Sequence, residues 1–340
     1  MPCCFPQGQS SINDRLAEGR RFAHNRFMFA YPSRLGVIAA FAATLILGLI
    51  ADLPMAQAAY GRVTLTVDGL KRTATLVEFD RLKKRRRPVI MVLHGGAGGS
   101  GAGLRARRNL GVDAVARKIG AIVVYPDAVD GYWGRAKPGE PAPDDAAFLR
   151  ALATRLIEQG VASHRRIYVA GVSGGGMLAM KIGCEQSDLF SGVGAFIANM
   201  PAEWAQSCKP AQPVAFMLMN GTADPMVPFN GGIAQMPEGP RDVLSAEATY
   251  ALFSKAAQCV GQRSETILDR DRNDGSRVLI DHGVGCRAPV EFVKVDGGGH
   301  TIPGRRLSTS RGLPVGAQNN DLDGARLMWE FLLKRAPQGN

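Results

Sequence analysis

The stretch RIYVAGVSGGGMLAMKIG, residues 166–183, contains a short apolar segment, a glycine-rich turn and a helical pattern in that order. The turn reads G-x-S-x-G, with Ser173 at its centre. Between a strand and a helix, this motif forms a turn too sharp for flanking side chains and exposes the serine at the carboxyl edge of a sheet. The adjacent helix N-terminus favours developing negative charge. We therefore interpret Ser173 as a nucleophile rather than as an incidental serine in a glycine-rich helix start.

Short apolar segments alternate with helical patterns on both sides of this turn. Two alternating strands, 62–68 and 73–79, flank Asp68-Gly69, which is a hairpin signal, and a second hairpin is expected at 264–282. Buried strands are expected at 89–93, 121–125, 166–170, 193–197, 214–219 and 290–295, and helices near 104–119, 144–159, 175–186, 241–258 and 321–334. This order predicts an α/β fold, with a mostly parallel central sheet and helices on both faces.

A serine nucleophile needs a base, usually histidine, that is oriented by a carboxylate. For a serine on this kind of turn, the chain order is Ser, then Asp or Glu, then His. His300 follows the last predicted strand and three glycines, which favours it as the base. Asp224 is the one carboxylate in the loop after strand 214–219 and is the expected acid. The alternatives are Asp296 as the acid and a turn-forming role for Asp224 before proline.

An apolar run near the start of the chain predicts export. Residues 36–50 are uncharged and apolar, follow Arg34 and precede the A-x-A sequence at 56–58, as in a secretory signal peptide. The run is shorter than the roughly 20 residues that span a bilayer. We expect a signal-peptide region at 1–58, with translation starting at Met1 or Met28. The remainder, 59–340, is then a single secreted or periplasmic domain without stable membrane insertion.

The glycine-rich loop LHGGAGGSGAGL, residues 93–104, has two interpretations. Its segment 96–101 formally matches G-x-G-x-x-G, which would indicate a dinucleotide site with an acidic residue about 20 positions later. Asp127 fits that spacing only loosely, and an exported protein seldom meets soluble NAD. We favour the second interpretation, in which a His-Gly-Gly loop supplies backbone N–H groups to an oxyanion hole.

In that second interpretation, Gly96 or Ala97 contributes one N–H group and Gly174 contributes the other. It explains the His-Gly-Gly sequence and the serine turn together. His94 is expected beside the substrate pocket. Trp133, in the sequence GYWG, is a second candidate for the pocket wall, with a surface-loop aromatic as the alternative.

Four cysteines remain after removal of the predicted signal peptide, and an even number in an exported protein suggests disulfides. Four cysteines allow three pairings. We favour the two local ones, Cys184 with Cys208 and Cys259 with Cys286. No pair has C-x-x-C spacing, so a zinc site or another metal site is not expected.

The chain carries a net charge of +11, and its one dense basic cluster is the run 81–87. A basic protein can associate with anionic envelope polymers. Charge runs are usually solvated, and this one lacks interleaved aromatic residues, so we expect a solvated loop and no nucleic-acid partner. The sequence carries no indication of the oligomeric state.

Six motifs occur in an order that resembles a known family. They are LHGG at 93–96, YPDAVD at 125–130, DAAFL at 145–149, GVSGGGM at 171–177, NGTADPMVP at 220–228 and GGGHTIPG at 297–304. Together they resemble the secreted polyhydroxybutyrate depolymerase and feruloyl esterase group of α/β hydrolases, which is like carbohydrate esterase family 1. The resemblance covers essentially the whole predicted mature chain.

The resemblance implies a serine esterase in which Ser173 is the nucleophile, Asp224 the acid and His300 the base. It also implies no cofactor, no large lid and the two local disulfides. The implied substrates are hydroxyalkanoate oligomers or polymers, or feruloyl and acetyl esters of plant polysaccharides. The chain departs from the family at Gly174, where alanine or asparagine is frequent, and at Ile302, where tryptophan is frequent. The second departure weakens the expectation of aromatic substrate stacking.

Three other functions compete with this interpretation. A peptidase of similar fold is one, although the sequence has no propeller or lid domain to select peptides. A nucleotide-binding oxidoreductase would use the glycine-rich loop. A non-catalytic envelope-binding protein would use the basic run 81–87.

Overall fold

The computed structural model describes residues 59–79, 86–96, 102–135, 139, 141–237, 239–266, 269–305 and 314–335. These residues belong to one compact unit, Ala56–Asn340. The expected signal peptide, Ala97 and residues 81–85 of the basic run lie outside the described residues.

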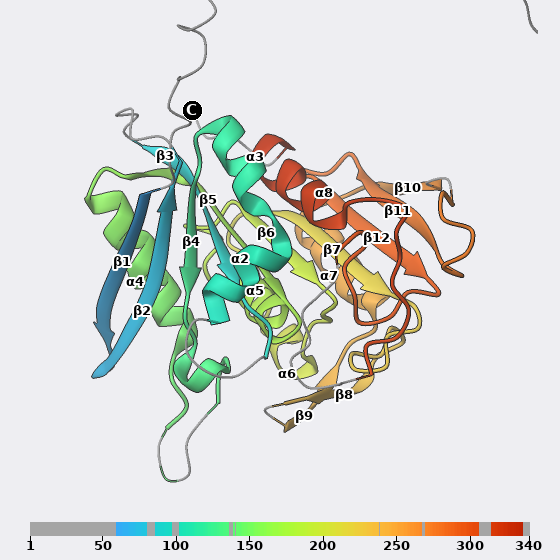
Figure 1. Ribbon diagram of the computed structural model, residues 1–340, viewed down its shortest axis with the longest axis horizontal. Coiled ribbons are helices and arrows are strands. Elements are labelled where there is room, and N and C mark those ends of the chain that lie inside the picture. Colours follow the sequence, from blue (N-terminus) through green and yellow to red (C-terminus); the bar gives the residue numbers. More distant parts are fainter. Residues whose placement is uncertain are drawn as a thin grey trace, which may run out of the picture. The chain divides into compact units, whose positions relative to one another are not determined.

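Ten strands of the described chain form one central sheet, in the order β1-β2-β4-β3-β5-β6-β7-β12-β11-β10 (Figure 1). The neighbours from β4 to β12 in this order are parallel, and antiparallel strands extend both edges. The strands are β1 Ala59–Val67, β2 Leu70–Glu78, β3 Arg87–Leu93, β4 Ile122–Pro126, β5 Ala162–Val172, β6 Gly192–Phe196, β7 Ala215–Gly221, β10 Gly261–Thr266, β11 Arg277–Val284 and β12 Val290–Asp296. The expected mostly parallel α/β sheet and both hairpins are confirmed.

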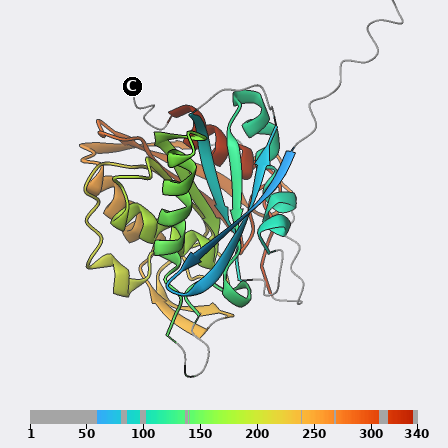
Figure 2. The ribbon, with the colours of Figure 1, turned by 90° about the vertical axis from the view of Figure 1, so that its left-hand side faces the viewer.

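Helices cover both faces of the sheet, as Figure 2 shows. One buried apolar cluster joins the sheet to α4, α5 and α7, and a second joins its other face to α2, α3 and α8. The helices are α2 Ala102–Leu110, α3 Val112–Ile119, α4 Asp145–Glu158, α5 Gly174–Glu185, α6 Ala202–Ala205, α7 Ala246–Ala256 and α8 Gly324–Glu330, with short turns η1 Val129–Gly131 and η2 Phe331–Arg335. This layering is the α/β-hydrolase arrangement that the sequence predicted.

Two predicted helices have different bounds in the structure. The helix expected at 104–119 is divided into α2 and α3 because Gly111 adopts the left-handed conformation, with φ 56°. The helix expected at 241–258 begins only at Ala246, after the side chain of Ser245 caps its first turn. The preceding residues form β9 (Gly239–Val243), which pairs with β8 (Gly232–Met236) in a small separate hairpin.

Both expected disulfides are present. Cys184, near the end of α5, is bonded to Cys208, which follows α6. Cys259, just after α7, is bonded to Cys286 in the turn between β11 and β12. Among the described residues, no helix has the length and apolar character required to cross a membrane.

The parallel strands share one carboxyl edge, where ligand sites of open α/β sheets usually lie. The loops after β3, β4, β5, β6, β7 and β12 therefore meet at the same edge of the sheet. The turn η1, helix α6 and the β8–β9 hairpin lie at this end of the molecule (Figure 1). Of the described residues that the sequence analysis proposed for the site, Gly174 is the first residue of α5, and the others follow these strands.

Candidate active site

Ser173 occupies the turn between β5 and α5. Its φ of 54° and ψ of −123° are uncommon for a residue other than glycine. Its backbone N–H donates to the carbonyl of Phe196 at 2.9 Å, and its carbonyl accepts the N–H of Met177 at 3.0 Å. These two bonds attach the turn to β6 and to the first turn of α5. Such strained residues occur at functional sites when the surrounding structure holds them in place.

The glycines of the G-x-S-x-G motif are required by close backbone contacts. A Cβ on Gly171 would lie 2.2 Å from the carbonyl carbon of Gly175. A Cβ on Gly175 would lie 2.4 Å from the backbone oxygen of His94. The first glycine allows β5 to turn directly into α5. The second allows α5 to start directly against the end of β3.

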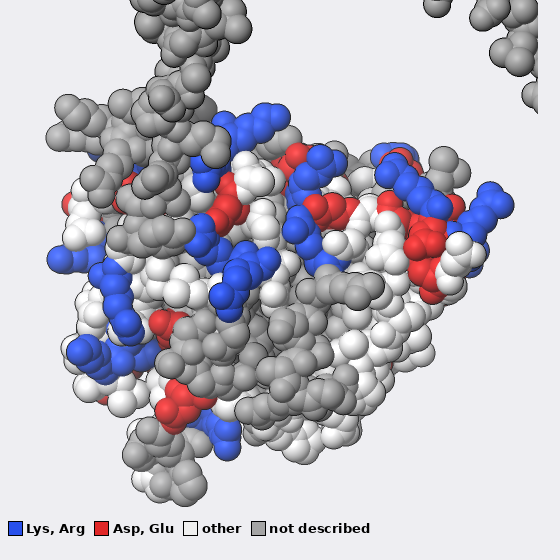
Figure 3. Space-filling model, viewed as in Figure 1, with Lys and Arg blue, Asp and Glu red and all other residues white. Residues whose placement is uncertain are grey.

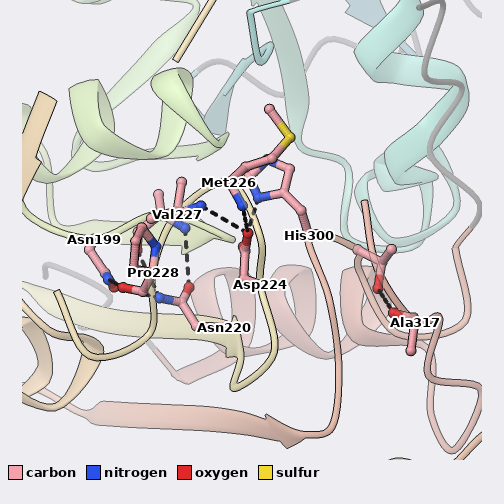
Figure 4. A network of polar contacts seen from close by, with 10 residues as sticks. Asn199, Asn220, Asp224, Met226, Val227, Pro228, His300 and Ala317 are labelled. Atoms are coloured by element: carbon pink, nitrogen blue, oxygen red, sulfur yellow. Dashed lines mark hydrogen bonds and ion pairs between the residues drawn. The ribbon is translucent and has the colours of Figure 1, made fainter. Parts of the chain in front are cut away.

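Asp224 and His300 come together at the carboxyl edge, as the sequence predicted. Oδ2 of Asp224 lies 2.7 Å from Nδ1 of His300, and both side chains are buried (Figure 4). Asp224 follows β7, and His300 follows β12, which is the strand paired with β7. A carboxylate accepts hydrogen bonds, so Nδ1 carries the proton and Nε2 is left as the basic nitrogen.

The loop around Asp224 holds the carboxylate in one orientation. Its second oxygen, Oδ1, accepts the N–H groups of Met226 at 2.8 Å and Val227 at 2.9 Å (Figure 4). Oδ1 is thus bonded to its own loop, and Oδ2 is bonded to His300. Because the carboxylate is fixed at both oxygens, it fixes the orientation of the imidazole as well.

Two buried asparagines that the sequence analysis did not identify support the same loop. The side chain of Asn220 bonds to the backbone of Ala198 through both its oxygen, at 3.1 Å, and its nitrogen, at 3.2 Å. It also donates to Asn199 Oδ1, and Asn199 donates to the carbonyl of Pro228 at 2.8 Å (Figure 4). The pair joins the ends of β6 and β7 to the far end of the Asp224 loop. Asn220 opens the NGTADPMVP motif, which was the available sequence signal.

The loop that carries His300 is supported by the segment after residue 313. The N–H of Gly299 donates to Ala317 O at 2.9 Å, and the N–H of His300 donates to Val315 O at 2.5 Å. The hydroxyl of Thr301 donates to the same Ala317 carbonyl at 2.9 Å. A Cβ on Gly299 would lie 2.1 Å from Val315 O, so this close approach requires glycine.

His94 is the first residue after β3, and both of its ring nitrogens have hydrogen-bond partners. Its Nε2 accepts the N–H of Ala128 at 3.2 Å, so the ring proton is on Nδ1 and is donated to Gly95 O at 2.8 Å. The ring stacks on Trp133, with centroids 4.8 Å apart, and Trp133 Nε1 donates to His94 O at 2.8 Å. Trp133 is buried, which corrects the alternative of a surface-loop aromatic.

This arrangement directs the backbone of Gly96. The carbonyl of Gly95 and the N–H of Gly96 belong to one planar peptide and point in opposite directions when it is trans. Because the carbonyl points toward the His94 ring, the N–H of Gly96 points away from that ring. A Cβ built on Gly95 would be 3.5 Å from the Cβ of Ser173, so this peptide lies directly beside the serine turn.

A buried ion pair lies next to Trp133. Nη2 of Arg72 on β2 is 2.5 Å from Oδ1 of Asp145, the first residue of α4, and Oδ2 accepts the N–H of Gly134 at 2.6 Å. Burial raises the pKa of Asp145, and the charge of Arg72 and these hydrogen bonds lower it only in part. The pair joins β2 and α4 to the residue that follows Trp133.

The alternative residues occupy other positions. Asp296 is partly exposed; its Oδ2 pairs with Arg277 at 2.9 Å and its Oδ1 accepts the hydroxyl of Thr222 at 3.2 Å, so both of these contacts are to groups other than His300. Asp127 accepts the hydroxyl of Thr73 at 3.0 Å. Ile302 is fully buried within the apolar cluster under α8. The position at which the resembled family often has tryptophan is therefore a core position in this chain.

On the face seen in Figure 3, acidic and basic side chains of the described residues are interspersed. The described residues of this face therefore form no continuous basic surface of the kind that binds polyanions through charge alone. Of the basic run, only Arg86 and Arg87 are described, and Arg87 pairs with Glu78 at 2.6 Å.

Comparison with known proteins identifies esterases. No family model matches the chain. The protein named "Putative esterase NocK" from Nocardia uniformis subsp. tsuyamanensis is 30% identical over 263 residues, which are 73% of this chain and 74% of that protein. Feruloyl esterase B from Piromyces equi is 27% identical over 187 residues, 53% of this chain and 34% of that protein. The matched region thus spans only about a third of the length of that second relative.

Solved structures with a similar arrangement include two esterases. The acetyl xylan esterase from Aspergillus awamori aligns with a TM-score of 0.47 and 12% identity, over 71% of this chain and 94% of that one. A ferulic acid esterase from Anaeromyces mucronatus aligns with a TM-score of 0.42 and 18% identity, over 61% of this chain and 82% of that one.

Proposed function

The chain belongs to the feruloyl esterase-like family of α/β hydrolases and is a carboxylic ester hydrolase, and we propose that Ser173, His300 and Asp224 form its catalytic triad. The contact of 2.7 Å between Asp224 and His300 carries this proposal. It pairs a carboxylate and an imidazole at the edge of the sheet where the strained serine turn lies. The chain order Ser, Asp, His is the one expected for this fold.

In the first half of the proposed reaction, Oγ of Ser173 attacks the ester carbonyl carbon while Nε2 of His300 takes the hydroxyl proton. The serine–carbon bond forms, and the carbonyl electron pair moves to the oxygen. Asp224 keeps the imidazole in the required tautomer and stabilises the imidazolium that forms. When the tetrahedral intermediate collapses, the oxyanion electron pair re-forms the carbonyl, the bond to the alcohol oxygen breaks, and His300 gives its proton to the leaving alcohol.

In the second half, water attacks the acyl-serine. His300 takes a proton from the water, the serine–acyl bond breaks, and Ser173 regains its proton from the imidazolium. The products are the free acid and the regenerated enzyme. All proton transfers in this scheme use the same Nε2 atom, and no cofactor is required.

Two backbone N–H groups are proposed to stabilise the oxyanion. The N–H of Gly174 is in the first turn of α5 and has no acceptor within its helix. The N–H of Gly96 is turned away from His94, and Ala97 is the alternative donor from the same loop. Each donor of this kind typically contributes a factor of about 10²–10³ in kcat.

We further propose that the enzyme is exported and that, after removal of the signal peptide, residues 59–340 act as a single catalytic domain in the periplasm or outside the cell. Two disulfides support an oxidising compartment. The proposed substrates are hydroxyalkanoate esters or the feruloyl and acetyl esters of plant polysaccharides. The names of the feruloyl esterase relatives support the second group. A panel of methyl ferulate, acetylated xylan and 3-hydroxybutyrate oligomers discriminates between them.

Replacement of the nucleophile tests the triad. We expect Ser173→Ala to abolish hydrolysis of p-nitrophenyl acetate, because no other group in the scheme can form the acyl-enzyme. Circular dichroism spectra and urea unfolding curves that match those of the wild type would show that the fold persists. Substantial turnover by a folded Ser173→Ala variant would refute the assignment.

A further inference from the structure

A hollow of about 270 Å³ lies where the start of α4, helix α5, helix α6 and strand β9 meet. Its side chains include Trp133, Leu178, Lys181, Trp204 and Arg241. We call this hollow the tryptophan groove. Its volume is close to the lower limit for ligand pockets in proteins, so it can hold part of a substrate rather than a whole polymer chain.

The tryptophan groove is connected to the proposed catalytic residues in two ways. Trp133 lines the groove and donates to the backbone of His94, in the loop beside the serine turn. Leu178 is four residues after Gly174 on α5, and Lys181 is three residues further. Residues three or four apart lie on the same helix face. The groove therefore begins about one helical turn from the proposed oxyanion donor.

Two cations converge on one indole ring in the groove. Nζ of Lys181 lies 5.4 Å from the ring centre of Trp204, and the guanidinium carbon of Arg241 lies 5.0 Å from it. Their carboxylate partners, Glu185 and Glu203, are exposed, and each is 3.8 Å from its cation. At this distance no hydrogen bond forms. Among the described residues, both cations thus keep donors available for a ligand.

Two acidic residues line the groove, and each has hydrogen bonds to groups of its own chain segment or of β2. Asp145 is paired with Arg72, and its second oxygen accepts the N–H of Gly134. Asp144 accepts the N–H of Ala147 and caps α4. Exposed ion pairs such as those of the two groove cations typically contribute only about 0–1 kcal/mol. A ligand carboxylate that is partly removed from water can therefore replace the glutamates.

We propose that the tryptophan groove binds a carboxylate carried on the chain of the ester substrate. Lys181 and Arg241 bind the carboxylate through charge-assisted hydrogen bonds. Trp133, Leu178 and Trp204 contact the apolar part of the chain. This inference rests on the proposed role of Ser173, because it defines the site from which the chain extends.

The position of the cations sets the length of the chain. Eight residues of α5 separate Ser173 from Lys181, which is a rise of roughly 12 Å. An extended chain covers that distance with about ten atoms. Because side chains on a helix lean toward its N-terminus, the Lys181 ammonium lies somewhat nearer, and the preferred substrate carries its carboxylate about eight to ten atoms from the ester carbonyl, on either the acyl or the alcohol side.

Two matched substrate pairs test the proposal. The acyl-side pair is the mono-p-nitrophenyl ester of decanedioic acid and the same ester with a terminal amide. The alcohol-side pair is a linear 3-hydroxybutyrate trimer and its C-terminal amide. In at least one pair, we expect kcat/KM to be about tenfold higher for the acid, through a lower KM.

The double variant Lys181→Gln/Arg241→Gln should bring the acid-to-amide ratio of kcat/KM to about one. The matched control is Lys255→Gln/Arg287→Gln, which removes two exposed charges outside the groove. The control should retain the wild-type ratio. The proposal would be overturned if the wild type had the same kcat/KM for acid and amide in both substrate pairs. It would also be overturned if the control variant lost the acid preference as fully as Lys181→Gln/Arg241→Gln does.

Calorimetric titration of the Ser173→Ala variant separates binding from chemistry. The acids should bind about tenfold more tightly than the amides, and the Lys181→Gln/Arg241→Gln changes should remove that difference. If the wild type hydrolyses no ester but the acids still bind more tightly than the amides, the proposed esterase function is wrong and the carboxylate site in the groove is supported. If esters are hydrolysed but neither acid is preferred in binding or turnover, the groove proposal fails and the esterase function stands.

Discussion

Asp224 and His300 are 76 positions apart in the chain, and the Oδ2 atom of the aspartate lies 2.7 Å from Nδ1 of the histidine. The contact joins the loops after β7 and β12, which are neighbouring parallel strands. The backbone N–H groups of Met226 and Val227 hold the other carboxylate oxygen. The imidazole is thus oriented before any substrate is present, and in the proposed reaction its Nε2 atom takes the proton.

We expect Asp224→Asn to reduce kcat by about 10⁴, because an amide that donates to Nδ1 selects the wrong imidazole tautomer. Steady-state kinetics with p-nitrophenyl acetate measure the effect. The control is Asp296→Asn, since this second candidate acid pairs with Arg277 instead. Its kcat should remain within about twofold of the wild type. A larger loss of kcat in the control than in Asp224→Asn would contradict the assignment of the acid.

We expect Trp133→Phe to lower kcat about tenfold, because the His94 carbonyl loses the indole donor that helps to fix the loop beside Ser173. The loss of one buried hydrogen bond should also cost about 1–2 kcal/mol in the free energy of unfolding. The matched control is Trp329→Phe, which removes an indole bond of the same length, 2.8 Å, to Leu110 O. Urea unfolding should give similar losses for both variants, whereas kcat should fall only for Trp133→Phe. If Trp133→Phe and Trp329→Phe had the same kcat, the bond to His94 would have no catalytic consequence.

Gly175→Ala should disrupt the junction of β3 and α5. The new Cβ would lie 2.4 Å from His94 O and 2.8 Å from Leu93 O, and both are backbone atoms. We expect a loss of more than about 3 kcal/mol in unfolding free energy, which is typical of severe steric conflict, and a loss of activity. Gly61→Ala is the control, since its nearest neighbour would be the Leu76 side chain at 3.8 Å. If urea unfolding finds the two alanine variants equally stable, this account of the motif is wrong.

Asp321 should make stability depend on pH. Burial alone would raise its pKa, but the N–H groups of Asp271 and Arg270 and the amide of Asn319 bind the carboxylate and lower the pKa below 3.8. Because the folded pKa is lower than the unfolded one, the contribution is present above about pH 4 and is lost as pH falls through the folded pKa.

The difference in unfolding free energy between the wild type and Asp321→Asn should therefore be largest at about pH 6 and should decrease as the pH is lowered to about 3. Urea denaturation at several pH values measures this difference. A difference that stays constant across this range would contradict the role of the charged carboxylate.

Much of the fold could be predicted from local patterns. The Asp68-Gly69 turn has φ values of 49° and 77°, as a tight hairpin turn between twisted strands requires. Asp-Gly is a frequent sequence for such turns, so the first hairpin could be predicted. The break between α2 and α3 at Gly111 could not be predicted, because the apolar periodicity of the sequence continues through this single glycine. The β8–β9 hairpin was missed because residues 232–243 lack the regular apolar alternation of the other strands.

The candidate site was predictable where one motif carried the information. Ser173, Asp224 and His300 each lie within a recognisable loop sequence. The supporting contacts depend on which strands are neighbours, and the sequence does not state that directly. The hydrogen bond between Asn199 and Asn220 forms only because β6 and β7 are neighbours in the sheet. The ion pair between Arg72 and Asp145 joins residues that are 73 positions apart in the chain. The groove likewise combines segments that no single pattern connects.

Labelling with a fluorophosphonate probe tests the central claim most directly, because the probe reacts with a serine that an adjacent base activates. The account predicts one probe per wild-type chain, on the tryptic peptide 167–181, in which Ser173 is the sole serine. It predicts no labelling of Ser173→Ala. Mass spectrometry of the digested protein gives the result. Labelling at a different serine, or undiminished labelling of folded Ser173→Ala, would contradict the claim that Ser173 is the nucleophile.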